Sequence, residues 1–136
     1  MESNNAAQAM NADRAITYAA RYSRYLQRLL SARPEVISTA EVEQSFTAAD
    51  MQAELAATAI SDDVSLGRAL RRLRQRVMAR LIVRDLGGYA NLDEVVGTMT
   101  QLAEITIRTA VARLHGDLAA RMSRAVHTSR VDRSAE

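Results

Sequence analysis

The stretch of sequence that decides the fold is LGRALRRLRQRVMARLIVRDL, residues 66–86. Its apolar residues recur at spacings of three and four, which is the period of an amphipathic helix. We therefore expect one helix from about Val64 to Leu86. Ser61-Asp62-Asp63 supplies the capping and acidic residues that favour a helix start, and Gly87-Gly88 ends it. The apolar row of this helix is Leu66, Leu70, Leu73, Val77 and Leu81.

The same helix carries an arginine at every fourth position from Arg68 to Arg84. At ~100° per residue, such a row drifts by ~40° per step around the helix. It begins opposite Leu66 and ends above the leucines, so Arg84 should project toward packed protein and need a fixed acceptor. The compensating charges could come from the segment 34–67, which holds seven acidic residues and no basic one. Further candidates are Asp85, Glu94, Glu104 or a partner outside the chain.

Two interpretations of the arginine row follow from the residues alone. The simpler one is a solvated, internally paired arginine face. The other is an anion or partner site, for which Arg84 is the stronger candidate.

Upstream of this helix, the spacing predicts a first helix from near Asp13 to Leu30, broken at Ser31–Pro34. A short helix should follow from Pro34 to about Gln44, with Val36, Ile37 and Ala40 facing inward. Thr47 and Asp50 form a capping-box pattern that starts a further helix, which ends near Ser61. Its inward row is Met51, Leu55 and Ala59.

The first helix carries a row of aromatic and apolar side chains on one face. We expect this row to pack against a neighbouring helix, because it occupies the position of a buried face. Stacking on nucleic-acid bases, with Arg21, Arg24 and Arg28 holding phosphates, is the alternative. The row consists of Tyr18, Tyr22, Tyr25 and Leu29.

Downstream, Asn91 with Glu94 caps a long last helix that could reach Met122. Residues 1–11 are expected to be a disordered lead-in, residues 12–122 a helical domain and residues 123–136 a polar tail that frays from His127. The predicted fold is all-α, a bundle of about five helices with a long C-terminal helix. The apolar row expected on the last helix is Leu92, Val95, Met99, Leu102, Thr106, Ala110 and Leu114.

Composition supports helices and excludes several classes of function. Among 136 residues there are 25 alanines, five glycines and one proline, and aromatics make up 4%. The absence of cysteine excludes disulfides, thiolate metal sites and a cysteine nucleophile. His115 and His127 lack metal-ligand spacing, and no run of ~20 apolar residues could span a membrane. No signal sequence is recognisable, so a cytoplasmic location is expected, and no catalytic triad, phosphate loop or paired carboxylates are visible.

Residues 70–86 resemble a helix of the glutamine-synthetase adenylyltransferase family, whose pattern is L-R-x-[FL]-R-x-R-x-M-x-R-I-x-x-x-[DQ]-L. Leu92–Val95 and Gln101–Glu104 are similar to the helix that follows in that family, where L-S-x-L-A-[ED] is typical. A weaker likeness at Ser23–Leu26 and 32–35 extends the resemblance to roughly residues 20–120. Val83 departs from the pattern, because many family members have tryptophan there.

The resemblance implies an N-terminal helical fragment of a longer enzyme. In the family these helices precede the first of two nucleotidyltransferase domains, which removes AMP from glutamine synthetase, while the second adds AMP from ATP. The resemblance implies Mg²⁺ and ATP as cofactors of the full-length enzyme, and glutamine synthetase and the regulatory protein PII as partners. The Gly-rich turn and Asp-x-Asp pair that bind Mg²⁺ are missing here, so we expect no activity from this chain alone. Contacts with the missing nucleotidyltransferase domain are expected from Arg74, Arg80, Arg84 and Asp85.

Two alternatives belong to other classes of function. An arginine-rich nucleic-acid-binding module would bind DNA or RNA with steep salt dependence. The net charge of +2 and the dense acidic segment count against it. A helical dimerisation domain would pair two copies of the fragment through the seam near Arg84.

Overall fold

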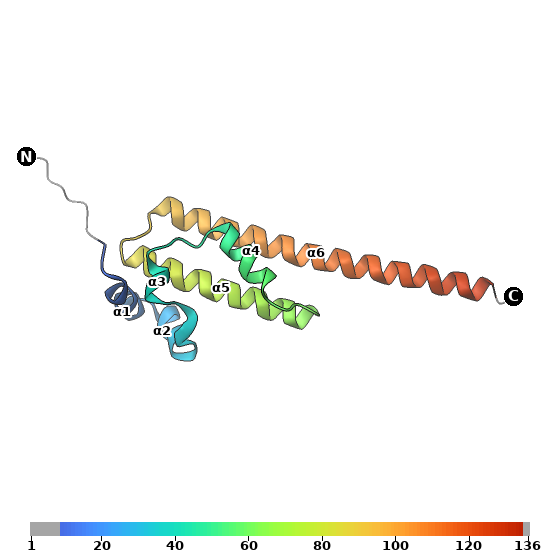
Figure 1. Cartoon of the computed structure of the whole chain (residues 1–136), viewed down its shortest axis with the longest axis horizontal. Coiled ribbons are helices and arrows are strands. Elements are labelled where there is room, and N and C mark those ends of the chain that lie inside the picture. Colours follow the sequence, from blue (N-terminus) through green and yellow to red (C-terminus); the bar gives the residue numbers. More distant parts are fainter. Residues whose placement is uncertain (1–8, 135–136) are drawn as a thin grey trace, which may run out of the picture.

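The computed structural model describes residues 9–134, which form an all-α structure with a long C-terminal helix, as predicted (Figure 1). The described part contains six α-helices and one 3₁₀ turn. Two long antiparallel helices, α5 and α6, lie side by side, and the shorter helices pack along them (Figure 1). The elements are α1 (Ala12–Tyr22), α2 (Arg24–Ala32), η1 (Pro34–Val36), α3 (Thr39–Val42), α4 (Ala48–Ala56), α5 (Asp63–Leu86) and α6 (Leu92–Arg133).

Helix α5 is the central element because it contributes to both clusters of the hydrophobic core. Its C-terminal half packs on α1, α2, η1 and α3 through Ala79 and Val83. Its N-terminal half packs on α4 and α6 through Ala69, Leu73 and Val77. The two clusters therefore lie one after the other along a single helix.

The predicted helix starts at Thr47, Asp62 and Asn91 are confirmed by their capping bonds. The Thr47 side chain accepts from the backbone N–H of Asp50, whose carboxylate accepts from the N–H of Thr47 in return. Asp62 and Asn91 accept from the backbone N–H groups of Ser65 and Glu94. Each bond satisfies an amide that has no partner inside its helix.

The single helix predicted over 13–30 is wrong, because the chain breaks at Ser23. This residue has extended backbone angles (φ −121°, ψ 107°), and its side chain caps α2 by accepting from the N–H of Leu26. The segment after Pro34 is also less regular than predicted, with a 3₁₀ turn and the short α3 in place of one helix. Val36 and Ile37 are buried as expected, but Ala40 is exposed.

The tyrosine row does not pack against a neighbouring helix, so that prediction is also wrong. Tyr18, Tyr22 and Tyr25 are 38%, 63% and 45% exposed, and only Leu29 of the row is buried. The buried face of α1 consists of Ala15 and Ala19, which are fully covered. Small side chains let α1 approach α5 closely, which leaves the aromatic rings on the outside.

The predicted ends of two helices, α4 and α6, are wrong. Helix α4 ends at Ala56, earlier than expected, and Ala59 is exposed, whereas Met51 and Leu55 are buried as predicted. Helix α6 does not end near Met122 but continues to Arg133, so most of the tail expected to fray is helical. Residues 1–8 of the predicted lead-in and residues 135–136 of the tail lie outside the described residues. Met10, by contrast, donates its backbone N–H to the Gly87 carbonyl at 3.2 Å.

Candidate functional site: the arginine network of α5

Burial of the arginine row on α5 increases step by step toward the C-terminal end of the helix. Arg68 and Arg72 are exposed, and the Arg76 side chain is 33% exposed. Arg80 and Arg84 are only 8% and 6% exposed. This gradient confirms the drift predicted from the four-residue spacing, which carries the row from solvent into the core.

Arg84 is held by acceptors from three parts of the chain. Its Nε and Nη2 donate to the two carboxylate oxygens of Glu94 at 2.7 and 3.0 Å. Its Nη1 donates to the Val42 carbonyl at 2.6 Å and its Nη2 to the Tyr89 carbonyl at 3.3 Å. The planar fork of arginine suits such a two-pronged bond to a carboxylate. One guanidinium thereby connects the end of α3, the α5–α6 turn and the start of α6.

Glu41 joins two further arginines of the row. One of its oxygens accepts from Arg76 Nη2 and from Arg80 Nη2, both at 2.8 Å. The other oxygen accepts from the backbone N–H and hydroxyl of Ser38, which closes a capping box at the start of α3. Arg80 also lies over the ring of Phe46 at 4.3 Å, within the range of a cation–π contact.

These contacts lower the pKa of Glu41. Burial by itself would raise it, but the hydrogen bonds from Ser38 and the charges of Arg76 and Arg80 outweigh that effect. Arg76 also binds Glu54 on α4, with Nε 2.9 Å from a carboxylate oxygen. Burial would lower the pKa of Arg76, but the two glutamates reverse this and raise it. Glu41 and Arg76 are therefore both charged at neutral pH.

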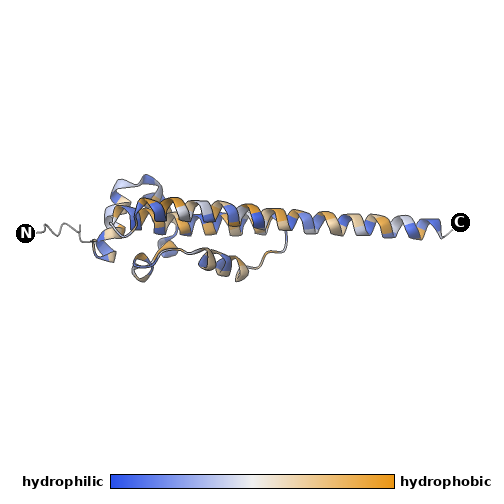
Figure 2. Cartoon of the chain, turned by 90° about the horizontal axis from the view of Figure 1, so that it is seen from above, coloured by the Kyte–Doolittle hydropathy of each residue, from blue (hydrophilic) through white to orange (hydrophobic). Residues whose placement is uncertain are grey.

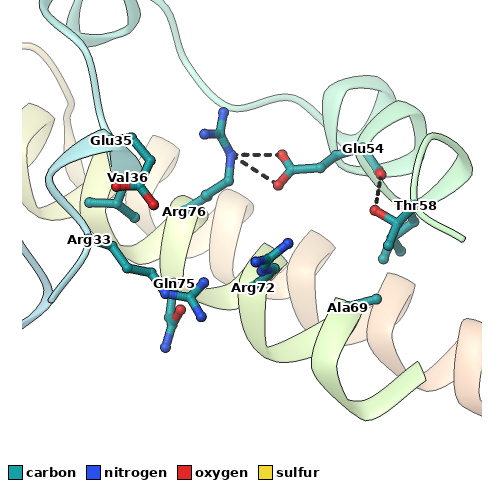
Figure 3. A pocket seen from close by; sticks show the side chains of 10 residues that line it. Arg33, Glu35, Val36, Glu54, Thr58, Ala69, Arg72, Gln75 and Arg76 are labelled. Atoms are coloured by element: carbon teal, nitrogen blue, oxygen red, sulfur yellow. Dashed lines mark hydrogen bonds and ion pairs between the residues drawn. The ribbon is translucent and has the colours of Figure 1, made fainter. Parts of the chain in front are cut away.

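A pocket of about 300 Å³ lies beside this network, between α4, α5 and the η1 segment. Figure 3 shows Arg33, Arg72 and Gln75 along one side and the Arg76–Glu54 pair along the other. The Oε1 atom of Gln75 is buried without a hydrogen-bond partner. The pocket thus offers cationic groups and an unused acceptor, but none of its lining residues is a nucleophile paired with a base.

The four arginine and aspartate positions predicted to contact a missing domain are placed very differently. Arg80 and Arg84 are buried and bound by groups of this chain, whereas Arg74 and Asp85 are exposed. Contact of any of the four with another domain stays a prediction. The acidic segment and Glu94 do compensate the row, as expected, through Glu41, Glu54 and Glu94.

Three acceptors of the network were not predicted: the Val42 carbonyl, the Tyr89 carbonyl and the Phe46 ring. None of them has a signal in the sequence, because any residue has a carbonyl and Phe46 is isolated from other motifs. The Ser38-x-x-Glu41 spacing of a capping box was a usable signal for Glu41.

The described residues show two further features that bear on function. Within residues 9–134, no group of three or more His, Cys, Asp or Glu side chains is placed to hold a metal ion. No helix in the same range is both long enough and apolar enough to cross a bilayer.

Comparison with known proteins gives one consistent result. The family model described as glutamate-ammonia ligase adenylyltransferase matches residues 12–135. The chain is similar to proteins named bifunctional glutamine synthetase adenylyltransferase/adenylyl-removing enzyme. It is 49% identical to that of Chromobacterium violaceum over 106 residues, which is 75% of this chain and 12% of the relative. For Nitrosomonas europaea the identity is 45% over 100 residues, which is 69% of this chain and 10% of the relative.

The relative from Ralstonia nicotianae is 37% identical over 111 residues, which is 77% of this chain and 12% of the relative. The chain thus spans about a tenth of the length of the curated relatives it matches. No solved structure matches it. Because the family model covers nearly the whole chain and several relatives agree, the chain belongs to the glutamate-ammonia ligase adenylyltransferase family.

Proposed function

We propose that this chain is a helical scaffold of a glutamine synthetase adenylyltransferase/adenylyl-removing enzyme and carries no catalytic step itself. Its function would be to hold the nucleotidyltransferase part of the enzyme in place or to help dock glutamine synthetase. The observation that carries this proposal is the arginine network of α5. Its buried charges are bound by carboxylates from α3, α4 and α6, so the network braces the fold and leaves no free acid or base for chemistry.

Mg²⁺ and ATP belong to the remaining polypeptide in this proposal. The residues described here do not fit a Mg²⁺ site, because within residues 9–134 no three His, Cys, Asp or Glu side chains lie where they could hold a metal ion together. Several of the carboxylates also have other partners. Glu41, Glu54 and Glu94 bind arginines, and Asp50 and Asp62 cap helices. We therefore assign no step through the metal or the nucleotide to this chain.

The partners proposed for the complete enzyme are glutamine synthetase and PII, in the cytoplasm. Support for glutamine synthetase comes from the names of the relatives. Of the four residues predicted to make contacts, Arg74 and Asp85 are the exposed ones.

A chimera tests the proposal. Residues 12–133 replace the matched segment of the Chromobacterium violaceum relative, and transfer of AMP to and from glutamine synthetase is measured with ATP and Mg²⁺. We expect the chimera to be active and the chain alone to be inactive. Activity of the chain alone, or a soluble, folded chimera without activity, would contradict the proposal.

A further inference from the structure

Helix α6 presents a second apolar face that no part of the described chain covers. Its core face is formed by Thr98, Leu102 and Ile105, which are buried. Large exposed apolar residues on the remaining surface have between 38% and 75% of their area exposed. Figure 2, which views the molecule from above, shows hydrophobic residues recurring along α6, including the part that extends past the shorter helices. The residues of this face are Leu92, Val96, Ile107, Val111, Leu114 and Leu118, here called the outer stripe.

The spacing of the outer stripe keeps it straight along the helix. Leu92 and Val96 recur eleven residues later as Ala103 and Ile107, and eleven later again as Leu114 and Leu118. An eleven-residue repeat stays within ~20° of one line on a helix that turns ~100° per residue. The same arithmetic puts the stripe roughly 150° around the helix from Leu102 and Ile105. A helix with two opposite apolar faces is expected to contact protein on both.

Charge along α6 indicates what kind of surface can cover the stripe. Residues 92–104 carry three acidic side chains and no basic one, whereas residues 105–131 carry five arginines and one acid, Asp117. Asp117 already lies 3.5 Å from Arg113 of the same helix. From Ile107 onward the stripe therefore lies in a stretch of net positive charge, to which Arg108, Arg121 and Arg124 contribute.

This pattern bears on two other possible occupants. Two copies in a twofold dimer run antiparallel, which brings acidic residues 92–104 of one copy toward the basic part of the other, so charge does not decide against a second copy and self-association is tested below. An anionic membrane would attract residues 105–131 but repel the acidic stretch beneath Leu92 and Val96. A helix with an apolar stripe and acidic borders suits the basic part of the stripe without that conflict.

We propose that the outer stripe of α6 binds an acid-bordered amphipathic helix from the part of the adenylyltransferase polypeptide that this chain does not contain. The proposal rests on the proposed function and names the surface through which the scaffold holds the rest of the enzyme. The curated relatives are far longer than this chain, so they contain additional protein that could supply the helix. The family match also runs to residue 135, so the stripe lies inside the region shared with them.

The accessibility of a single thiol tests this proposal. The chain has no cysteine, so Leu118→Cys places one thiol on the stripe and Ala120→Cys one on the opposite side of the same turn. Both variants are made in the isolated chain and in the chimera described above. Maleimide labelling rates are followed by mass spectrometry of the peptide that carries the new cysteine.

We expect both thiols to react quickly in the isolated chain. In the chimera, labelling of Leu118→Cys should slow at least tenfold, while labelling of Ala120→Cys stays fast. Equal rates at the two positions in a chimera that transfers AMP would overturn this inference and leave the proposed function standing. An inactive but folded chimera in which Leu118→Cys is protected would contradict the proposed function and leave this inference standing.

Two measurements on the isolated chain do not depend on the chimera. We expect it to sediment as a monomer at tens of micromolar, and we expect vesicles containing phosphatidylglycerol to leave Leu118→Cys labelling unchanged. Self-association that protects Leu118→Cys would assign the stripe to a second copy. Protection by vesicles would assign it to a membrane, and either result would overturn the proposal.

Discussion

At the scale of single residues, Arg84 is surrounded by acceptors that come from α3, the α5–α6 turn and α6. Its guanidinium is buried, so removing it would leave the Val42 carbonyl and the Glu94 carboxylate without their partner. An unpaired charge in such a position is costly because it loses its bonds without regaining full hydration.

We predict that Arg84→Met destabilises the protein by about 3 kcal/mol. The free energy of unfolding would be measured by urea titration followed by circular dichroism. Arg74→Met is the matched control, because Arg74 is exposed on the same helix and should change stability by less than about 0.5 kcal/mol. Equal effects of the two substitutions would show that the bonds of Arg84 contribute nothing specific.

Glu41 predicts how stability responds to acid. Its pKa is lowered in the folded protein from the ordinary value of 4.5, so the folded state favours the carboxylate. The resulting stabilisation is present above pH 4.5 and is lost as the pH falls through the lower, folded-state pKa. We therefore predict that the wild-type protein loses stability between about pH 5 and pH 3, and that Glu41→Gln flattens this dependence.

The measurement is urea unfolding at a series of pH values. Glu43→Gln is the control, since Glu43 is exposed and makes no ion pair within residues 9–134. The Asp50 and Asp62 pKa values are also lowered, mainly by hydrogen bonds from Thr47 and Ser65, so some acid sensitivity should remain in Glu41→Gln. A Glu41→Gln profile that matches the wild type would contradict the prediction.

At the scale of elements, the end of α5 contains two glycines, and each is required there for a different reason. Gly88 has φ of +83°, a conformation that residues with a side chain rarely adopt. Gly87 is buried against α1, and a Cβ atom there would lie 2.7 Å from both the Ala15 Cβ and the Val83 carbonyl oxygen. The turn between α5 and α6 therefore depends on glycine for conformation at one position and for space at the other.

We predict that Gly87→Ala destabilises the protein by about 2 kcal/mol, because α1 must move away from α5. Gly97→Ala should have the opposite sign. A Cβ at Gly97 meets no atom within 4 Å, and alanine stabilises a helix interior by up to about 1 kcal/mol relative to glycine. Thermal unfolding of both variants checks the pair, and a stabilising Gly87→Ala would refute the close contact between α1 and α5.

The elements show which features a sequence can specify. Asn91 and Thr47 were predicted as caps because a cap depends on residues three positions apart, and such local patterns survive folding. The drift of the arginine row was likewise predictable from helix geometry. The break at Ser23 was not, since serine fits both a helix interior and a cap, and only the packing of α2 decides between them.

Contacts between elements were predicted less well. The tyrosines of α1 and α2 were expected inside because their spacing puts them on one face of a continuous helix. Ala15 and Ala19 form the buried face of α1 instead and bring α1 close to α5. Glu94 was recognised as a cap residue and as one possible acid for the arginines. Its bond to Arg84 depends on how the α5–α6 turn places the start of α6 relative to the end of α5, which no pattern in the sequence specifies.

At the scale of the whole molecule, α6 is much longer than the body it packs against. With 42 residues it is about 63 Å long, compared with about 36 Å for the 24 residues of α5. Its contacts with the other helices end near Arg113, which donates to the Ser61 carbonyl at the start of α5. The rest of α6 projects beyond the body as a lone helix (Figure 1).

The part of α6 that projects beyond Arg113 is only marginally stable in water as a lone helix, because helices gain most of their stability from tertiary packing. We therefore predict that removing residues 120–136 leaves the midpoint of thermal unfolding within about 2 °C of the full chain, since no core residue is lost. Limited trypsin digestion should cut first at Arg121, Arg124 and Arg130. The exposed arginines of α5 should resist cleavage, because that helix is packed along its whole length.

A shorter variant that ends at Thr100 provides the contrast. It removes Leu102 and Ile105, which are buried between α4, α5 and α6, and should lower the unfolding midpoint by more than 10 °C. If removal of residues 120–136 lowered the unfolding midpoint equally, the projecting part of α6 would have to be stabilised in the isolated chain by contacts other than those with α1 to α5. A protected, trypsin-resistant end in the isolated protein would point to the same conclusion.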